Sequence, residues 1–392
     1  MKTLKRTWAD ISLDNLEYNY RSIRAHLPQG TKFLGVMKAD AYGHGAVPVS
    51  RALADLGAEY LAVSNLEEAV QIRRGEVRLP ILILGYTPAE YAANMIFLDI
   101  TQEVHSLEYA RELNEALVGT NYILNVHLKL DTGMTRIGFF AYDNERTLDE
   151  LRQVAQLPHL HIEGVFMHFC VADSRAEADV SFTKLQYKRF MDMLSAMAGV
   201  GIRPEIRHCC NSGATILYPE FALDMVRPGI ITYGNAPSDE LEGALSLRPM
   251  MSLHSMIAQV RTVPAGTDIS YGRLYRTKEE TRVAVLPIGY ADGLSRLLTG
   301  KASFYLQGHQ VPVIGRICMD MCMIDVSNVP EAKPGDVVTI FGYDDDGTLL
   351  PCERLARAQG TINYELLCQI SKRIPRICHR GAETSQILQY IV

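Results

Sequence analysis

The stretch Val36-Met37-Lys38-Ala39-Asp40-Ala41-Tyr42-Gly43-His44-Gly45 places a lysine between an apolar run and a loop of small residues. The run from Phe33 to Met37 predicts a buried parallel strand, and the glycines of the loop allow backbone to approach a ligand closely. A lysine at the carboxyl end of such a strand is partly desolvated, which favours its neutral amine. A neutral amine can form a Schiff base with an aldehyde, and Tyr42 follows closely enough to contact the phosphate of an aldehyde cofactor. From spacing alone, an ordinary surface lysine after a strand fits equally well.

Strand-like apolar runs alternate with amphipathic helical segments on both sides of this stretch. Helices are expected from Ser12, which caps the first, and over 46–56, 66–73, 88–95, 106–117, 144–156 and 182–198, with a short one within 211–219. Eight strands separated mostly by helices predict an α/β fold with an N-terminal (β/α)8 TIM-type barrel in residues 1–246. An open doubly wound sheet remains the alternative, because a miscount of one strand would change the assignment. The expected strands are 33–37, 60–63, 81–84, 98–101, 122–130, 162–168, 206–209 and 223–226.

Residues 247–392 have a different character, with Gly-, Pro- and Asp-rich turns between strand-like segments at 252–263, 282–288, 311–326 and 337–341. The one helix expected here covers 352–358. We therefore predict a C-terminal β-rich domain, with which the first residues of the chain, up to about Asp10, are free to pack.

Composition excludes several classes of function. The chain has 392 residues, 47% hydrophobic and 21% charged, and a net charge of -6, which argues against nucleic-acid or membrane-surface binding. The eight cysteines are irregularly spaced, which predicts reduced thiols in a cytoplasmic protein. No Cys-x-x-Cys or His-x-x-x-His spacing indicates a metal site, and no apolar run of about 18 residues indicates a membrane span.

Polar residues follow several of the predicted barrel strands. In a barrel of this type the loops at the carboxyl ends of the strands build the active site, so these residues are expected to converge. Cationic and imidazole groups gathered at one rim indicate an anionic ligand. The residues concerned are Lys38, Lys129, Asp131, Arg136, His168, His208, Asn211, Ser212 and the segment Arg227-Pro228-Gly229-Ile230.

The ordered set of motifs resembles the alanine racemase family, pyridoxal-phosphate enzymes built from a barrel and a β domain. The resemblance covers essentially the whole chain, and the ordered set is far more specific than any one motif. It rests on residues 8–11, 36–45, 129–138, 167–169, 208–212, 226–229, 270–272, 287–293, 315–320 and 361–365.

The resemblance implies two acid–base groups. Lys38 would bind the cofactor aldehyde and act on one face of the substrate, and Tyr271, supplied by the partner subunit of a homodimer, would act on the other. His168 is expected to hydrogen-bond Tyr271 and favour its phenolate, because the reference pKa of tyrosine is about 10. Arg227 would face the pyridine nitrogen and leave it unprotonated, because a guanidinium does not readily give up a proton. Without the resemblance, Tyr271 would be assigned as a core tyrosine in a strand-turn. For Arg227, an ordinary surface ion-pairing residue is the minor alternative.

The remaining implied roles concern binding. The phosphate would be held by Tyr42, Ser212, Tyr364 and the backbone amides near Gly229 and Ile230. His208 would pack on the cofactor ring, with a core histidine as the alternative. The substrate carboxylate would be bound by Arg136 and the amide of Met319. The family often carries a carbamylated lysine at the position of Lys129, which orients that arginine.

The leading hypothesis is thus a homodimeric, cytoplasmic isomerase that uses pyridoxal 5'-phosphate to interconvert L- and D-alanine for cell-wall precursors. A racemase for serine or a broader set of amino acids is the close alternative, although a residue as bulky as Tyr364 favours the smaller substrate. A cofactor-carrier protein and a fold-related decarboxylase are alternatives from other classes. The carrier would have no use for a second base such as Tyr271.

Overall fold

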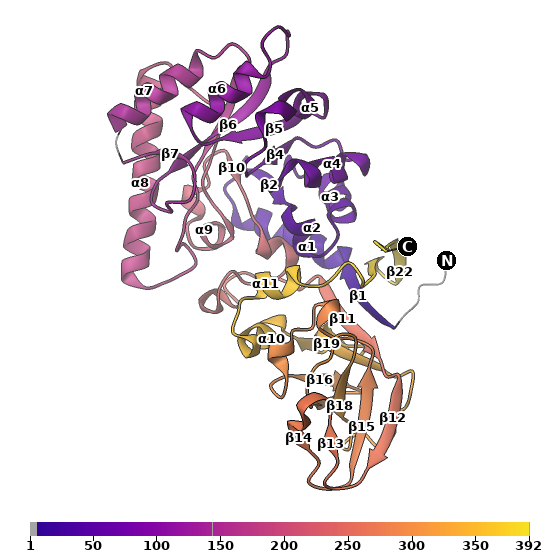
Figure 1. The fold of residues 1–392 in the computed structure, drawn as a ribbon. Helices are drawn as coiled ribbons and strands as arrows, with labels where there is room; N and C mark the ends of the chain where they lie inside the picture. Colours follow the sequence, from indigo (N-terminus) through magenta and orange to yellow (C-terminus); the bar gives the residue numbers. More distant parts are fainter. Residues whose placement is uncertain (1–5, 143, 392) are drawn as a thin grey trace. The chain divides into compact units, whose positions relative to one another are not determined.

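The computed structural model describes residues 6–142 and 144–391 (Figure 1). The described chain forms two compact units. The barrel unit comprises Leu16–Ala41 and Ala46–Arg248. The β-rich unit comprises residues 6–15, Tyr42–Gly45 and residues 249–391. The four residues Tyr42–Gly45 thus group with the β-rich unit, although they lie between the first strand and the second helix of the barrel.

Parallel strands of the barrel unit close into a ring in the order β5-β4-β3-β2-β10-β9-β8-β6, and β5 pairs with β6 to complete it. The predicted (β/α)8 barrel is therefore confirmed, and the open sheet is excluded. Most residues of these strands are buried, as expected for parallel strands covered by helices, although the first half of β8 is not. Their bounds are β2 (Lys32–Val36), β3 (Tyr60–Val63), β4 (Ile81–Ile83), β5 (Ile100–Val104), β6 (Leu124–Asp131), β8 (Leu160–Phe166), β9 (Ile206–His208) and β10 (Met225–Val226), with a short β7 (Phe139–Phe140) beside the end of β6.

Helices surround these strands (Figure 1). Side-chain caps start four of the described helices: Ser12 accepts the amide of Asn15, Asn65 that of Glu68, Ser106 that of Tyr109, and Asn211 that of Ala214. Helix α8 begins at Glu177, five residues before the expected start at Phe182. The helices are α1 (Leu13–His26), α3 (Ala46–Asp55), α4 (Leu66–Arg74), α5 (Ala92–Phe97), α6 (Leu107–Glu115), α7 (Asn144–Ala155), α8 (Glu177–Gly199) and α9 (Ser212–Leu217), with a single left-handed turn α2 (Lys38–Tyr42) and 3-10 turns η1 (Ala89–Tyr91), η2 (Pro219–Phe221), η3 (Ile230–Tyr233) and η4 (Asp239–Leu241).

The β-rich unit is built on one long sheet in the order β12-β15-β18-β17-β16-β19-β11-β1-β21-β22, with β20 paired to β19. Part of its core is formed by Ile269, Val283, Ile314 and Met323. Its strands are β1 (Thr7–Ser12), β11 (Met251–Met256), β12 (Gln259–Val263), β13 (Asp268–Ile269), β14 (Tyr275–Arg276), β15 (Thr281–Leu286), β16 (Ser303–Leu306), β17 (His309–Ile314), β18 (Cys322–Asp325), β19 (Val337–Tyr343), β20 (Leu349–Leu350), β21 (Arg376–Arg380) and β22 (Glu383–Leu388). Its helical turns are η5 (Tyr271–Arg273), η6 (Tyr290–Asp292), η7 (Arg296–Leu298), α10 (Cys352–Gln359) and α11 (Asn363–Cys368).

Three expectations for this unit were wrong in detail. The strand expected over 252–263 is two strands, β11 and β12, and the strand expected over 311–326 is β17 and β18. In the second case Gly315, with φ +67°, breaks the extended run, and a loop that carries Met319 follows. Helix α11, which carries Tyr364, was not expected, because six residues show too little of a helical period to be recognised.

Candidate active site

Lys38 follows β2 closely, and the residues after it form a left-handed turn. The four residues from Ala39 to Tyr42 have φ between +51° and +55°. None of them is glycine, and the left-handed conformation costs an L-residue about 1–2 kcal/mol. Glu68 helps to hold the turn, since its carboxylate accepts the amides of Ala39 at 2.7 Å and Ser64 at 2.8 Å. The exposed Lys38 is therefore followed by backbone whose direction is set by a residue of α4.

Arg227, just after β10, is held at the carboxyl end of the barrel by several hydrogen bonds. It is 4% exposed. Its guanidinium donates to Nδ1 of His208 at 2.9 Å, to the carbonyls of Met167 and Cys209 at 2.8 and 3.1 Å, and to Nδ1 of His168 at 3.4 Å. Burial lowers the pKa of Arg227 to about 10, so the guanidinium remains charged at neutral pH.

His168 marks the point where the cationic side chains of the barrel converge. Burial lowers its pKa well below the usual range, and the positive charges of Arg227, Lys129, Arg136 and Lys38 lower it further. The imidazole is therefore neutral at physiological pH. Four of the predicted strand-end residues thus lower the pKa of one imidazole, and their summed positive charge favours an anionic ligand.

Lys129, in β6, is a buried lysine. Its Nζ donates to the carbonyl of Leu130 at 3.0 Å and lies 5.3 Å from the ring centre of Phe166. Burial, and then the charge of Arg227, lowers the pKa of Lys129 to about 7. Near neutral pH about half of this amine is therefore unprotonated and nucleophilic.

The loop after Lys129 is shaped by Asp131. Its Oδ1 accepts the amides of Gly133, Met134 and Thr135 at 2.9 to 3.1 Å. This loop ends on Arg136, whose side chain is exposed. The carboxylate is therefore used for local structure and does not bind a cation in this loop.

Ser212 and Gly229 form the part of the rim expected to hold a phosphate. The buried Ser212 hydroxyl accepts the amide of Gly229 at 2.9 Å. Since a hydroxyl that accepts one bond keeps its own proton for donation, Ser212 can still donate to an anion. Ser212 begins α9, Ile230 begins the turn η3, and Asn211 caps α9 by accepting the amide of Ala214 at 3.0 Å. Two helical N-termini thus start at this point of the rim.

The β-rich unit carries Tyr271 on a tight turn. Tyr271 is 69% exposed, and Ser270 and Gly272 on either side of it have φ of +67° and +74°. The Ser270 hydroxyl donates to the carbonyl of Arg316 at 2.7 Å. A segment fixed by the loop between β17 and β18 therefore presents the phenol to solvent.

The same loop carries Met319, which is 52% exposed. Gly289 packs so tightly against it that an added Cβ would lie 2.4 Å from the Met319 carbonyl oxygen. The next residue, Asp320, forms an ion pair with Arg373 at 2.9 Å. The Met319 backbone is thus held from two sides.

Tyr42 and Tyr364 lie together within the β-rich unit, with ring centres 6.0 Å apart. Next to Tyr42, the carbonyl of Gly43 accepts a 2.9 Å bond from Arg376, whose guanidinium also binds the carbonyls of Ser371, Ile374 and Ile370. A Cβ on Gly43 would lie 2.5 Å from the Leu367 carbonyl oxygen. The residues expected to hold a phosphate are therefore on two units, with Tyr42 and Tyr364 on one and Ser212, Gly229 and Ile230 on the other.

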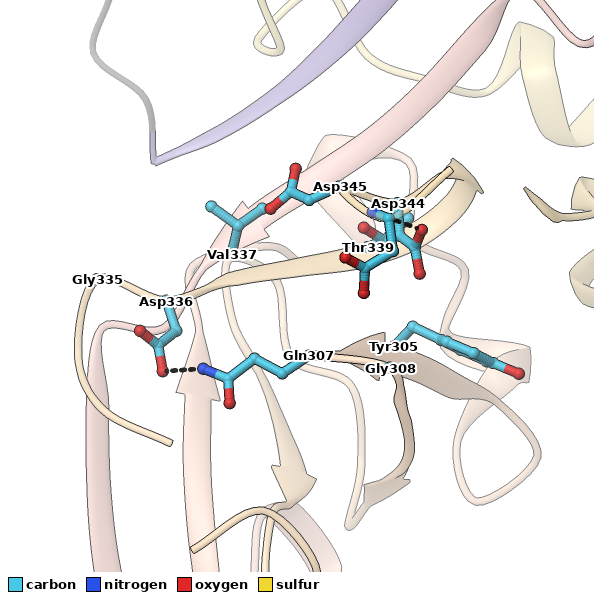
Figure 2. A pocket seen from close by; sticks show the side chains of 10 residues that line it. Tyr305, Gln307, Gly308, Gly335, Asp336, Val337, Thr339, Asp344 and Asp345 are labelled. Carbon is cyan, nitrogen blue, oxygen red and sulfur yellow. Dashed lines mark hydrogen bonds between the residues drawn. The ribbon is translucent and has the colours of Figure 1, made fainter. Parts of the chain in front are cut away.

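A separate hollow lies in the β-rich unit, with a volume of about 490 Å³ (Figure 2). Asp336, Asp344, Asp345 and Asp346 give its lining an acidic character, and Gln307 donates to Asp336 at 3.1 Å. None of the residues predicted for the active site lines it. Its charge is opposite to the one that an anionic cofactor needs.

Two polar residues in the barrel, the buried His127 and the partly exposed Glu163, were missed by sequence analysis. His127 is a residue of β6. Its Nδ1 is hydrogen-bonded to Nε2 of His208 at 2.8 Å, and its Nε2 to the carboxylate of Glu163 at 3.1 Å. A signal existed for His127, since His127, Lys129 and Asp131 alternate along β6 and so point to one face. Glu163 has no such pattern around it. His208 itself is completely buried and stacked on Phe166, with ring centres 4.9 Å apart.

Comparison with known proteins identifies the family. The family model described as alanine racemase, N-terminal domain, matches residues 11–237, and the C-terminal domain model matches residues 250–378. The chain belongs to the alanine racemase family.

Relatives of the alanine racemase family match over nearly the whole chain. The alanine racemase of Desulfovibrio desulfuricans is 46% identical over 94% of this chain and 97% of its own. That of Clostridium tetani is 42% identical over the full length of both. The solved alanine racemase of Clostridium difficile 630 superposes with a TM-score of 0.93 at 40% identity, with both chains fully covered. The Bacillus anthracis alanine racemase with bound L-Ala-P gives a TM-score of 0.93 at 34% identity, covering 100% and 99% of the two chains.

None of the helices in residues 6–142 and 144–391 combines the length and the apolar character needed to cross a membrane.

Proposed function

We propose that this protein is a pyridoxal-phosphate-dependent isomerase that interconverts L- and D-alanine. Membership of the family and full-length similarity to alanine racemases support the reaction. The observation that carries the proposal is the convergence of four cationic side chains on the neutral His168, with Arg227 buried among them. Such a donor set fits an anionic cofactor and a carboxylate substrate. The D-alanine product would supply cell-wall precursors.

The residues present fit pyridoxal phosphate. Lys38 would hold its aldehyde carbon, Arg227 would face its ring nitrogen, and Tyr42, Ser212 and Tyr364 would hold its phosphate. The amides of Gly229 and Ile230 and the buried His208, which orients Arg227, complete the proposed binding set. When bound, the cofactor supplies an electron-withdrawing ring conjugated to the α-carbon of the substrate.

Inversion needs one proton-transfer group on each face of the α-carbon, because a single base tends to return the proton to the side it left. We assign Lys38 to one face and Tyr271 of the partner subunit to the other. Arg227 donates to Nδ1 of His168, so the neutral ring carries its proton on Nε2 and can donate it to the phenolate form of Tyr271. A guanidinium does not readily give up a proton, so Arg227 would leave the nitrogen of the cofactor ring unprotonated. An unprotonated ring withdraws electrons less strongly, which disfavours side reactions.

A homodimer follows from this assignment, and exposed apolar side chains in the β-rich unit support it. Tyr271, Leu274, Met319 and Ile362 are each more than half exposed and would be covered by a second subunit that packs on this unit. We further propose a cytoplasmic location. It is supported by the eight cysteines, which are all free thiols, five of them buried.

For the substrate carboxylate we propose Arg136 and the amide of Met319. Lys129 would orient Arg136 after reaction with carbon dioxide, because a carbamate is anionic whereas an ammonium would repel the guanidinium. The bulk of Tyr364 favours alanine over serine and larger amino acids.

The state of Lys129 gives a pH-dependent prediction. Only the neutral amine reacts with carbon dioxide, and the pKa of about 7 places its appearance near neutrality. With ¹³C-labelled bicarbonate, we expect a protein-bound carbamate signal by NMR at pH 8 that is largely lost at pH 6. The Lys129→Ala variant is the control and should show no such signal. A signal of equal size in that variant would assign the carbamate to another amine.

The reaction itself is tested with pure L-alanine in deuterium oxide. We expect D-alanine to form with deuterium at the α-carbon, and slower turnover with serine and larger amino acids. A cofactor carrier would cause neither inversion nor exchange, and a decarboxylase would release carbon dioxide. Serine turned over as fast as alanine would instead support the broad-specificity racemase.

A further inference from the structure

A continuous chain of hydrogen bonds runs through the barrel unit, away from Arg227. Its guanidinium donates to Nδ1 of His208 at 2.9 Å, Nε2 of His208 meets Nδ1 of His127 at 2.8 Å, and Nε2 of His127 meets Oε2 of Glu163 at 3.1 Å. The same Oε2 accepts from the Tyr60 hydroxyl at 2.8 Å. The chain starts just beyond the carboxyl end of β10 and ends near Tyr60, the first residue of β3. It therefore connects the two ends of the barrel.

The chemistry at its ends determines every proton in this chain. A guanidinium can only donate, so Nδ1 of His208 must be an acceptor and its proton must sit on Nε2. That proton is donated to Nδ1 of His127, whose own proton must then sit on Nε2 and point at Glu163. An ionised carboxylate can only accept, so working from Glu163 gives the same assignment. If either imidazole gained a second proton, an N–H group of that ring would point at an N–H group of its neighbour, with no acceptor between them.

The protonation states required by this chain agree with the environment of each group. Burial lowers the pKa of both His127 and His208, which keeps them neutral. Burial alone would raise the pKa of Glu163, but the hydrogen bond from His127 and those from Tyr60 and Thr101 outweigh it and keep the carboxylate ionised. Burial raises the pKa of Tyr60, which remains a donor.

The barrel makes room for the chain at a specific glycine. His127 in β6 pairs in register with Gly164 in β8, and a Cβ at Gly164 would lie 2.5 Å from the His127 ring. His208 is held on its other side by stacking on Phe166, with an interplanar angle of 10°. Arg227 has no carboxylate partner among the described residues, so Glu163 is the first acid that its bonded chain reaches.

We propose that Glu163 is a positioning residue of the active site, which acts through His127 and His208 to fix the orientation and charge of Arg227. The inference rests on the proposed function, in which Arg227 faces the cofactor ring. Glu163 carries a negative charge, and the two imidazoles, polarised by their hydrogen bonds, transmit its effect to the guanidinium of Arg227. A carboxylate in direct contact with Arg227 would instead place an acid beside the nitrogen of the cofactor ring. Its side chain is 20% exposed, and its oxygen accepts from His127, Tyr60 and Thr101.

The proton arrangement is tested on the full-length protein with ¹⁵N-labelled histidine, independently of turnover. Long-range ¹H–¹⁵N spectra should show His127 and His208 as neutral rings protonated on Nε2, with assignments from single-residue variants. A proton on Nδ1 of either ring, or a doubly protonated ring, would overturn the relay.

Turnover then tests what the relay does. Glu163→Gln keeps an acceptor for His127 but removes the charge, and we expect kcat to fall roughly tenfold, the effect of about one pKa unit at a coupled group, with KM little changed. The cofactor absorbance of this variant should shift. Tyr60→Phe, the matched control, removes one bond to the same carboxylate but leaves its charge, and should keep kcat within about twofold. Equal losses in the two variants would indicate simple packing and reject the proposal.

A second pair of variants covers the case in which Glu163→Gln does not fold. The amide of His127→Gln can accept from His208 and donate to Glu163, whereas His127→Leu can do neither. We expect the glutamine variant to retain about tenfold more turnover than the leucine variant. Equal turnover in the two would reject the relay. A wild-type protein that fails to racemise alanine would reject the proposed function instead, whatever the histidine spectra show.

Discussion

Replacing Lys38 with alanine will abolish the cofactor-derived visible absorbance of the purified, dialysed protein and its racemase activity. Lys38 is the amine proposed to hold the aldehyde, and no other lysine stands at the turn after β2. Losing a proton-transfer group alone lowers turnover by about 10²–10⁴-fold, and loss of the covalent anchor adds to this. The measurements are the visible spectrum and the rate of D-alanine formation.

Lys32→Ala is the matched control for this experiment. Lys32 is an exposed lysine at the opposite end of the same strand, so its replacement should leave both spectrum and rate near those of the wild type. If Lys38→Ala retained an absorbance that survived dialysis and denaturation, another amine would have to be the cofactor anchor.

The Tyr271→Phe variant is expected to keep the cofactor absorbance and lose most of its turnover. The phenol is the proposed acid–base group on the second face, and phenylalanine keeps its shape while removing the hydroxyl. We expect kcat to fall by about 10²–10⁴-fold with little change in KM, because the group acts on the proton and binds little of the substrate. Steady-state kinetics in both directions measure this.

Tyr275→Phe serves as its control. Tyr275 lies four residues further along the same segment and packs against the core of the β-rich unit, so loss of its hydroxyl should have little effect on turnover. Normal turnover by Tyr271→Phe would show that the two-base mechanism is wrong for this protein.

Much of the barrel was predictable because its strands are apolar runs of the kind that parallel sheets bury on both sides. The segments 60–63 and 81–83 were located almost to the residue by this signal alone. Strand boundaries were predicted wrongly where polar residues interrupted an apolar run. The strand β5, Ile-Thr-Gln-Glu-Val, is fully buried, yet because of its three central polar residues the expected strand began two residues too early. In the β-rich unit, turns such as the one at Gly315 divided apolar segments that looked continuous.

Only part of the candidate active site could likewise be predicted from the sequence. The strand-end residues Lys38, Lys129, Arg136 and Arg227 were visible as polar groups after apolar runs, and the charge that they bring to bear on His168 could be anticipated. The turn after Lys38 could not. Its four left-handed residues include no glycine, and the carboxylate that holds the first of them belongs to Glu68, 29 residues further along the chain.

By itself, the sequence determined which segments become strands and helices, and which polar side chains stand at the strand ends, because hydrophobic periodicity and local capping act over a few residues. Only the tertiary structure decided the partners of those side chains. His208 contacts His127 across 81 positions of the chain, and His127 contacts Glu163 across 36. Closure of the barrel brings these groups within hydrogen-bond distance, with both imidazoles completely buried, so that each of their protons must have an acceptor, and no local pattern carries that information.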